Sequence, residues 1–169
     1  NQKQLDFQPP PKEKKERALG VKLFLKGERC SSPKCAMIRR PYRPGMHGKK
    51  RRRALSEYGQ QLMEKQRIRV SYGLREAQMR QIFKRAFQKT SGVGEAVITI
   101  LEKRLDNVVY RFGFAPSRIT ARQYINHGHF LVNGKKVAAP SFQVKVGDVV
   151  SIKPKSKNLL IFKDLPTTI

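Results

Sequence analysis

The sequence predicts an α+β fold: an extended basic N-terminal arm, then a helical domain, then a small domain of two short helices and an antiparallel sheet. Three observations predict it. Positive charge is concentrated near the N-terminus, apolar residues recur at helical spacing in the middle, and the last third carries hairpin signals. The corresponding segments are residues 1–53, 54–98 and 99–169.

The charge of the chain indicates the class of its partner. Its 169 residues include 37 Lys and Arg against 12 Asp and Glu, a formal net charge of +25. Such a chain repels itself, which favours a polyanionic partner. The hydrophobic share of 38% still supplies a core. No apolar run approaches the roughly 18 residues of a membrane span, so no membrane partner is expected.

The arm carries most of this surplus, with sixteen cations and three acids in residues 12–53. Pro9–Pro11 favour an extended path, and we expect the mixed charges that follow to gain order only on a partner. Residues 38–53 interleave prolines, glycines and Tyr42 with cations, five of which are consecutive at 49–53. This mixture suits RNA contacts with stacking, the alternative being a solvated charge run or a localisation tag.

Helical signals begin after the arm. Ser56 is expected to cap a helix that runs to Tyr72 and stops at Gly73, and a second helix runs from Leu74 to about Lys89. The predicted core stripe consists of Met79, Ile82, Phe83, Ala86 and Phe87 and, after a break at Gly92 and Gly94, of Val97, Ile100, Leu101, Leu105, Val108, Val109 and Phe112.

The last third changes to shorter elements. Ser117 is expected to cap a short helix over 118–126, which ends at Gly128. Asn133-Gly134 lies between apolar runs and predicts a hairpin, because a type I′ turn needs positive φ at both residues. Further strand signals are the alternation of Phe142, Val144 and Val146 and the Gly147-Asp148 turn before Val149–Ile152, which together predict three or four strands.

A cluster of cations is expected around the short helix. Arg118 and Arg122 are four residues apart and share one face, with Gln123 beside it, and the hairpin tip adds Lys135 and Lys136. Guanidinium groups bind phosphate in a bidentate manner, so we predict a phosphate-binding corner. The alternative is that both arginines lie on the solvent-exposed face of the helix and bind no ligand. We expect loss of Arg122 to weaken RNA binding with little change in stability.

Several motifs resemble a known family. Leu101–Arg111, Ser117–Gln123, Asn126–His129 and Val132–Gly134 together resemble the S4 RNA-binding domain. Upstream, Tyr42–Gly48 resembles a Pro-Gly-x-His-Gly loop. Together with Glu64–Arg67 and Tyr72-Gly73, it narrows the resemblance to the ribosomal protein S4 (uS4) family of bacterial-type small subunits, over about residues 21–157.

The resemblance implies a structural constituent of the small ribosomal subunit. Members of the family are primary 16S-type rRNA-binding proteins that nucleate assembly, lie beside protein S5 near the channel through which mRNA enters, and influence decoding accuracy. The expected location is the cytoplasmic ribosome or an organellar one. The alternative is an S4-domain factor that modifies RNA or binds it as an accessory.

The residues assigned to RNA binding share a positive charge, an aromatic ring or a place in a family motif. They are Tyr42, Arg43, Pro44, Gly45, His47, Gly48, Lys49, Lys50, Arg51, Arg52, Arg53, Tyr58, Lys65, Arg67, Arg69, Tyr72, Arg80, Arg104, Arg111, Arg118, Thr120, Arg122, Gln123, His127, Asn133, Lys135 and Lys136.

Two other classes of protein are less consistent with the sequence. An enzyme would need a nucleotide loop or a supported catalytic set, and the chain offers neither, so no catalytic residue and no enzymatic activity are expected. A DNA-binding regulator would need a recognition helix, which residues 118–126 could mimic. The polybasic arm and the family motifs favour RNA instead.

Cys30 and Cys35 match the second of two cysteine pairs with which some family members bind Zn²⁺, whereas Glu13 and Glu16 occupy the expected first pair. A structural zinc site has four protein ligands, mostly thiolate or imidazole groups. The two cysteines are therefore half of such a site, to which His47 could add a third ligand. We expect free thiols without zinc or another cofactor, with bound zinc and a disulfide as the alternatives.

Overall fold

The structure of the chain, a computed structural model, describes residues 11–50, 54–88 and 92–162. The chain divides within one helix into two compact units, residues 1–67 and 68–169. The predicted boundaries at residues 53 and 98 do not coincide with this division. Within the described ranges, the structure contains no helix with the length and apolar character needed to cross a membrane.

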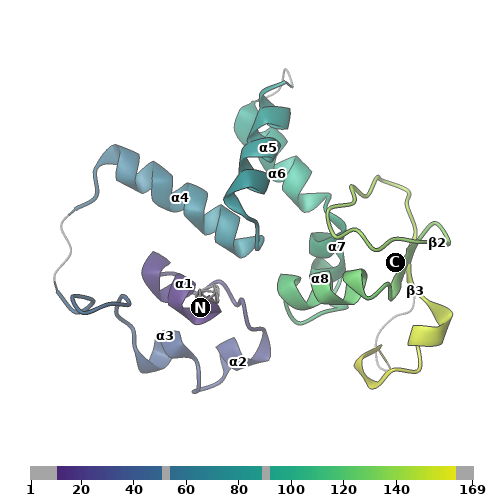
Figure 1. Cartoon of the computed structure of the whole chain (residues 1–169), viewed down its shortest axis with the longest axis horizontal. Helices are drawn as coiled ribbons and strands as arrows, with labels where there is room; N and C mark the ends of the chain where they lie inside the picture. The colour runs from purple at the N-terminus through teal and green to yellow at the C-terminus, as the bar shows by residue number, and fades with distance from the viewer. Residues whose placement is uncertain (1–10, 51–53, 89–91, 163–169) are drawn as a thin grey trace, which may run out of the picture. The chain divides into compact units, whose positions relative to one another are not determined.

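The first unit is built from short helices. They are α1 (Lys12–Leu19), α2 (Glu28–Ser31), α3 (Ala36–Arg39) and the larger part of α4 (Glu57–Ser71). α1 packs against α3 (Figure 1). The predicted cap of α4 is confirmed, because the Ser56 hydroxyl accepts the backbone N–H of Gly59 at 3.2 Å.

The extended path predicted for the arm is wrong over residues 12–39. There the chain forms three short helices, and α1 buries the carboxylate of Glu16. Glu16 is fully buried, and its Oε1 accepts the backbone N–H groups of Leu23 at 3.0 Å and Leu25 at 3.2 Å. The remaining parts of the predicted arm, residues 1–10 and 51–53, lie outside the described residues.

The second unit starts with a helical pair. The chain turns at Gly73, where φ is 63°, into α5 (Glu76–Phe87) and then α6 (Val93–Glu102), and the two helices lie side by side (Figure 1). The predicted stop at Gly73 is confirmed, whereas Gly94, predicted as a break, lies within α6. The buried core of the pair consists of Leu74, Met79, Ile82, Ala86, Ala96, Val97, Ile100 and Leu101.

Three aromatic residues of the predicted core stripe are not fully buried. Phe87 is 69% exposed and Phe112 is 55% exposed, so their assignment to the core is wrong. Phe83 is half-buried and packs against the core of the pair. Successive residues of a helix are turned by about 100° around its axis, so when Ala86 faces the core, Phe87 points away from it.

The S4-like part of this unit contains two helices and a three-stranded sheet. Its elements are α7 (Leu105–Arg111), α8 (Arg118–Asn126), β1 (Phe130–Val132), β2 (Lys135–Lys136), β3 (Val150–Ile152), η1 (Pro154–Ser156) and η2 (Leu160–Phe162). The sheet is antiparallel in the order β2-β1-β3, with Leu131 opposite Lys136 and Ser151. These observations confirm the α+β fold class.

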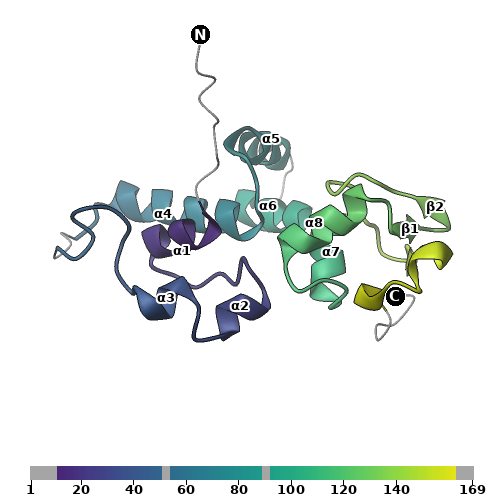
Figure 2. The same ribbon diagram turned by 60° about the horizontal axis from the view of Figure 1, so that its bottom comes forward.

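The local turn predictions in this part are confirmed. Ser117 caps α8, because its hydroxyl accepts the backbone N–H of Thr120 at 3.2 Å. At the hairpin tip, φ is 50° at Asn133 and 76° at Gly134, as a type I′ turn requires. α7 and α8 pack side by side near this hairpin (Figure 2). The shared core includes Leu105, Val109, Phe114, Ile125, Phe130, Val150, Ile152 and Phe162.

One predicted strand is absent from this sheet. Residues 142–146 form a single antiparallel bridge, Arg104 with Gln143, and Val146 is fully exposed. The backbone groups of this segment pair with the start of α7 instead: Val144 N–H donates to Lys103 O at 2.8 Å, and Leu105 N–H donates to Phe142 O at 2.9 Å. This pairing lies at the junction between α6 and α7.

Candidate nucleic-acid interface

The basic loop of the first unit is held in place by an arginine that sequence reasoning missed. Nε of Arg17, on α1, donates to the backbone oxygens of Arg40 and Tyr42, both at 3.0 Å, and Arg43 donates back to Ala18 O at 3.2 Å. Because Arg17 belongs to a run of mixed charges, no local signal distinguishes it from its neighbours. Its structural role depends on contacts about 25 residues away.

The Pro-Gly-x-His-Gly segment is a compact turn. Gly45 has a φ of 106°, and a Cβ at Gly48 would lie 1.9 Å from the backbone oxygen of Arg43, so only glycine fits at Gly48. The turn leaves Arg43, His47 and Lys49 exposed. These cations and the imidazole are therefore presented to solvent on a fixed backbone.

Tyr42 lies between two cations. The guanidinium carbon of Arg17 is 5.1 Å from its ring centroid, and Nζ of Lys49 is 5.3 Å from the same centroid. A base that stacks on this ring has to compete with one of these cations. Pro44, Gly45, Gly48 and Lys50 surround Tyr42 in sequence, whereas Arg51, Arg52 and Arg53 lie outside the described residues.

The predicted site residues of α4 differ in their surroundings. Tyr58 is 74% exposed, and Arg67 is paired with Glu64 at 2.7 Å one turn away. Lys65, which also belongs to the first unit, is half-buried. Arg69, in the part of α4 that belongs to the second unit, lies 3.6 Å from the carboxylate of Glu76.

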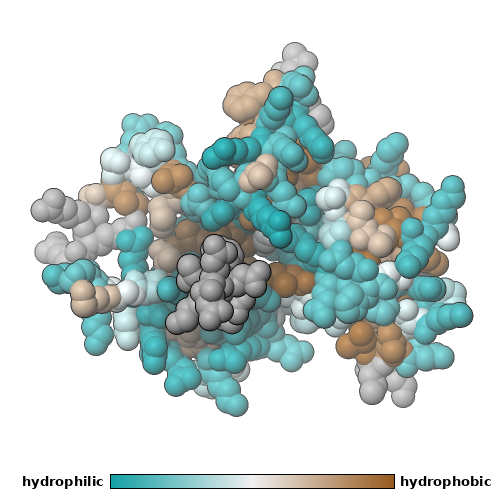
Figure 3. Space-filling model, in the orientation of Figure 1, coloured by the Kyte–Doolittle hydropathy of each residue, from teal (hydrophilic) through white to brown (hydrophobic). Residues whose placement is uncertain are grey.

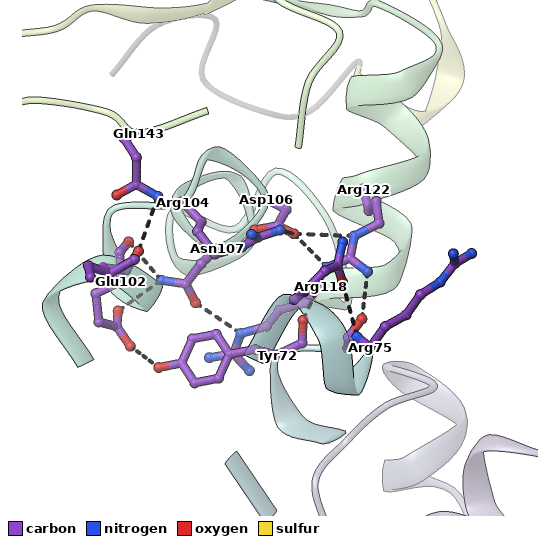
Figure 4. A network of polar contacts seen from close by, with 12 residues as sticks. Tyr72, Arg75, Glu102, Arg104, Asp106, Asn107, Arg118, Arg122 and Gln143 are labelled. Carbon is purple, nitrogen blue, oxygen red and sulfur yellow. Dashed lines mark hydrogen bonds and ion pairs between the residues drawn. The ribbon is translucent and has the colours of Figure 1, made fainter. Parts of the chain in front are cut away.

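A polar network in the second unit has Glu102 as its centre (Figure 4). Its carboxylate accepts hydrogen bonds from the hydroxyl of Tyr72, from Asn107 Nδ2 at 2.8 Å and from Arg111 Nη2 at 2.9 Å. Partial burial raises the pKa of Glu102, but the bonds from Arg111, Tyr72 and Asn107 outweigh it and lower the pKa to about 2. The carboxylate therefore stays ionised and links the end of α4 to α6 and α7.

Asp106 forms the second centre of the network (Figure 4). Arg104 donates to both of its oxygens, from Nε at 3.1 Å and from Nη2 at 2.8 Å, and Arg122 donates to Oδ2 from Nη2 at 2.7 Å. Arg104 and Asp106 are both buried. Arg122 also donates to Gly73 O at 2.7 Å and to Tyr72 O at 3.1 Å, which ties α8 to the turn before α5.

Arg118 is held by aromatic rings and one amide. Its guanidinium carbon lies 4.6 Å from the ring centroids of both Tyr72 and Tyr110, and its Nε donates to Asn107 Oδ1 at 2.9 Å. Figure 4 shows this side chain directed into the network beside Arg122.

The predicted phosphate-binding corner needs correction. Arg104, Arg118 and Arg122 have protein partners, so the face shared by Arg118 and Arg122 is not a pair of free guanidinium groups. Arg111 is exposed but paired with Glu102. A stabilising role for these arginines was not visible in the sequence, because their partners come from distant elements.

Other predicted residues of the second unit face solvent. Gln123, His127, Lys135, Lys136 and Arg80 are exposed. A Cβ at Gly128 would lie 2.3 Å from Cε of Lys136, so the lysine stem crosses the end of α8, and the hairpin lies beside this helix as expected. Thr120 and Asn133 have structural partners, Thr120 at Ser117 and Asn133 at Asp148.

The two cysteines belong to the first unit, where both are buried and neither is in a disulfide. Burial raises the pKa of the Cys30 thiol, and the charges of Glu16 and Glu13 act in the same direction against the opposing backbone N–H of Lys26. This shift favours the protonated form of the Cys30 thiol.

The carboxylates next to the cysteines do not complete a zinc site. Oε1 of Glu16 already accepts two backbone N–H groups, and Glu13 is paired with Arg29 at 3.2 Å and Lys26 at 3.8 Å. Within the described ranges, no three His, Cys, Asp or Glu side chains are placed to hold one metal ion. This donor set does not fit the closed tetrahedral coordination of structural zinc.

Comparison with known proteins agrees with the motifs. Residues 9–102 match the ribosomal protein S4/S9 N-terminal domain, and residues 103–150 match the S4 domain. The small ribosomal subunit protein uS4 of Thermus thermophilus is 54% identical over 144 residues, which cover 85% of this chain and 69% of that protein. The uS4 protein of Gloeobacter violaceus is 55% identical over 140 residues, covering 83% and 68%.

A third relative gives the same result. The uS4 protein of Clostridioides difficile is 51% identical over 146 residues, which cover 86% of this chain and 70% of that protein. The two family models together span the loop of the first unit and the network of the second. With two domain matches in sequence order and identities above half over most of its length, the chain belongs to the ribosomal protein S4 (uS4) family.

Proposed function

We propose that this protein is a structural constituent of the small ribosomal subunit and that it binds 16S-type rRNA. The membership of the uS4 family, whose bacterial relatives are named small ribosomal subunit proteins, carries the proposal. The net charge of +25 supports a polyanionic ligand independently. No catalytic role is part of the proposal.

The exposed cations indicate where RNA binds. In the first unit the turn presents Arg43, His47 and Lys49, and in the second unit the hairpin presents Lys135 and Lys136. These residues lie on backbone fixed by glycine turns, so phosphate contacts cost little ordering of the chain. In the second unit, Arg104, Arg118 and Arg122 have protein partners, so they are not proposed as the main phosphate ligands.

The finer parts of the proposal follow the family resemblance. They are a primary binding role that nucleates subunit assembly, contact with protein S5, and a position near the channel through which mRNA enters, with an effect on decoding accuracy. The ribosome is the proposed location, in the cytoplasm or in an organelle.

Binding of a small-subunit rRNA transcript to the full chain tests the proposal, with duplex DNA of equal charge as the control. If phosphate neutralisation dominates through six to ten contacts, affinity falls by roughly 10³–10⁵ between 50 and 200 mM salt. Cosedimentation with small subunits should approach one copy per subunit. Substoichiometric recovery would favour the alternative of an accessory RNA-binding or RNA-modification factor.

We further propose that the chain functions without stoichiometric zinc or another cofactor. The support for this proposal is that the described residues supply two thiols, while Oε1 of Glu16 is bound to two backbone N–H groups and Glu13 is paired with Arg29. Elemental analysis of protein prepared without chelator measures the zinc content directly. About one zinc atom per chain would contradict the proposal.

A further inference from the structure

A histidine of the second unit, His129, fastens residues 154–162 to the core of the S4-like part. Its Nδ1 lies 2.9 Å from the hydroxyl oxygen of Ser156, the last residue of η1, and its backbone oxygen accepts the N–H of Lys153 at 2.8 Å. Ser156 is only 6% exposed, so its hydroxyl has little access to water. The bond to the imidazole therefore satisfies a buried polar group.

The same imidazole packs within a group of aromatic rings. Its centroid lies 5.7 Å from the ring centroid of Phe162, on η2, and 6.3 Å from that of Tyr124, on α8. Phe162 is 2% exposed, and its ring also lies 5.3 Å from that of Tyr124. His129 thus holds both η1 and η2, the first through a hydrogen bond and the second through ring packing.

The surroundings of His129 favour its neutral form. The residue is half-buried, and the charged groups that act on it are His127, with a ring centroid 5.9 Å away at the end of α8, and Lys153, which follows β3. Tyr124 also faces the ring, and the stem of Lys136 lies against the end of α8. Among the described residues, no carboxylate acts on the imidazole. Burial lowers the pKa of His129 below 6.5, and the charges of His127 and Lys153 lower it further.

We propose that His129 is a pH-sensitive latch: its neutral imidazole holds residues 154–162 on the core of the S4-like part, and its protonation releases them. The neutral ring can either donate to the Ser156 hydroxyl or accept from it, whereas the protonated ring can only donate. Protonation also places a positive charge beside Lys153 in a half-buried site. The latch does not depend on the proposed rRNA ligand.

Acid favours release because the pKa of His129 is lowered only in the held state. In the released state the imidazole has an ordinary pKa of about 6.5, so this state binds a proton more readily. The stabilisation of the held state is therefore complete above about pH 7.5, and it is lost as pH falls from 6.5 towards the lowered pKa. Within that window the ratio of released to held segment rises by up to about tenfold per pH unit.

Release changes the surface at this end of the second unit. Leu159 is 40% exposed and Ile161 is 48% exposed, and apolar surface is visible there in the space-filling view (Figure 3). Release of the segment removes Phe162 from the core and adds its ring to this apolar surface.

Hydrogen exchange of the full chain between pH 7.5 and pH 5.5 tests the latch, with the rates corrected for the intrinsic pH dependence of amide exchange. The amides of Ser156 and Phe162 are hydrogen-bonded to backbone oxygens, and their protection should fall several-fold, by at most about tenfold. The hydrogen-bonded amide of Met79, in α5, is the internal control and should keep its protection. An equal loss at Met79 would overturn the latch, because acid would then open the whole unit.

A pair of matched variants identifies the group that titrates. His129→Phe keeps a ring at this position but cannot be protonated, so the protection of Ser156 should no longer depend on pH. His47→Phe makes the same change in the first unit and should keep the wild-type response. The latch would be overturned by constant protection of Ser156 in the wild type, or by an unchanged pH response in His129→Phe.

A titration of the wild-type chain supplies a readout that needs no variant. Nuclear magnetic resonance of the imidazole protons should give His129 a pKa below 6.5, and the resonances of Phe162 should shift with the same midpoint. A pKa of His129 at or above 6.5 would overturn the latch, because protonation would then not oppose the held state.

Discussion

Arginines serve different purposes in the two units of this protein. In the second unit, Arg104 and Arg122 donate to one buried carboxylate, that of Asp106. In the first unit, Arg39 and Arg40 are exposed and have no side-chain partner among the described residues. The comparison teaches that a cation-rich sequence does not show which cations bind RNA, because some of them are bound to partners within the protein.

The number of Asp and Glu side chains near the arginines explains why the arginines differ between the two units. Residues 12–53 contain sixteen cations and three acids, and in the first unit Glu16 is used by the backbone and Glu13 by two cations. In the second unit, Glu102 and Asp106 each serve several donors at once. Cations beyond the local supply of acids are left for an external anion.

The largest expected effect is at the shared carboxylate. Asp106→Ala should lower the free energy of unfolding by about 3–5 kcal/mol, because it leaves Arg104 buried without a counter-charge and removes the main partner of Arg122. Urea denaturation followed by circular dichroism measures the change. Lys84→Ala is the surface control and should stay within about 0.5 kcal/mol of wild type. A mild effect of Asp106→Ala would mean that the network is not a structural centre.

A paired substitution compares the two units directly. Arg122→Ala should cost about 1–3 kcal/mol, because it removes bonds to Asp106, Gly73 and Tyr72. Arg40→Ala should leave stability within about 0.5 kcal/mol and weaken rRNA binding instead. Denaturation and rRNA-binding assays on both variants measure these effects. If Arg40→Ala destabilised the protein and Arg122→Ala weakened only rRNA binding, the assigned roles of the two arginines would be wrong.

The first unit has one polar centre of its own, at Glu16. Glu16→Ala should destabilise this unit by about 1–3 kcal/mol, because the N–H groups of Leu23 and Leu25 lose their acceptor. Hydrogen exchange at these two amides reports the local opening, and Glu16→Gln, which keeps an acceptor oxygen, is the matched control. Added zinc should not restore protection. Restoration by zinc would show that a metal can take over the role of the carboxylate.

The smallest effect concerns pH and Glu102, whose side chain is 35% exposed. Its pKa is lowered from 4.5 to about 2, so the folded state holds the charged form more strongly than the unfolded state does. The stability from this group is complete above about pH 5 and is lost as pH falls from 4.5 towards 2. The stability difference between wild type and Glu102→Gln should therefore shrink between pH 6 and pH 3, as measured by denaturation at each pH. A constant difference would mean that the carboxylate does not titrate as the network requires.

The amino-acid sequence by itself determined the elements that depend on local signals. The cap at Ser117 and the helix over 118–126 need only neighbouring residues, as does the Asn133-Gly134 turn, because hydroxyl caps and positive φ angles are properties of short segments. The family motifs are equally local. The helix over 118–126, the hairpin and the family of the chain could therefore be predicted.

Only the tertiary structure decided which cations are available and which apolar residues are buried. Arg122 meets Gly73 across 49 residues and Arg17 meets Arg40 across 23, and no spacing rule anticipates such pairs. The segment around Val144 pairs with the start of α7, although its alternation is typical of a strand. A hydrogen bond or an ion pair depends on which groups meet in space, and that depends on the packing of the whole unit.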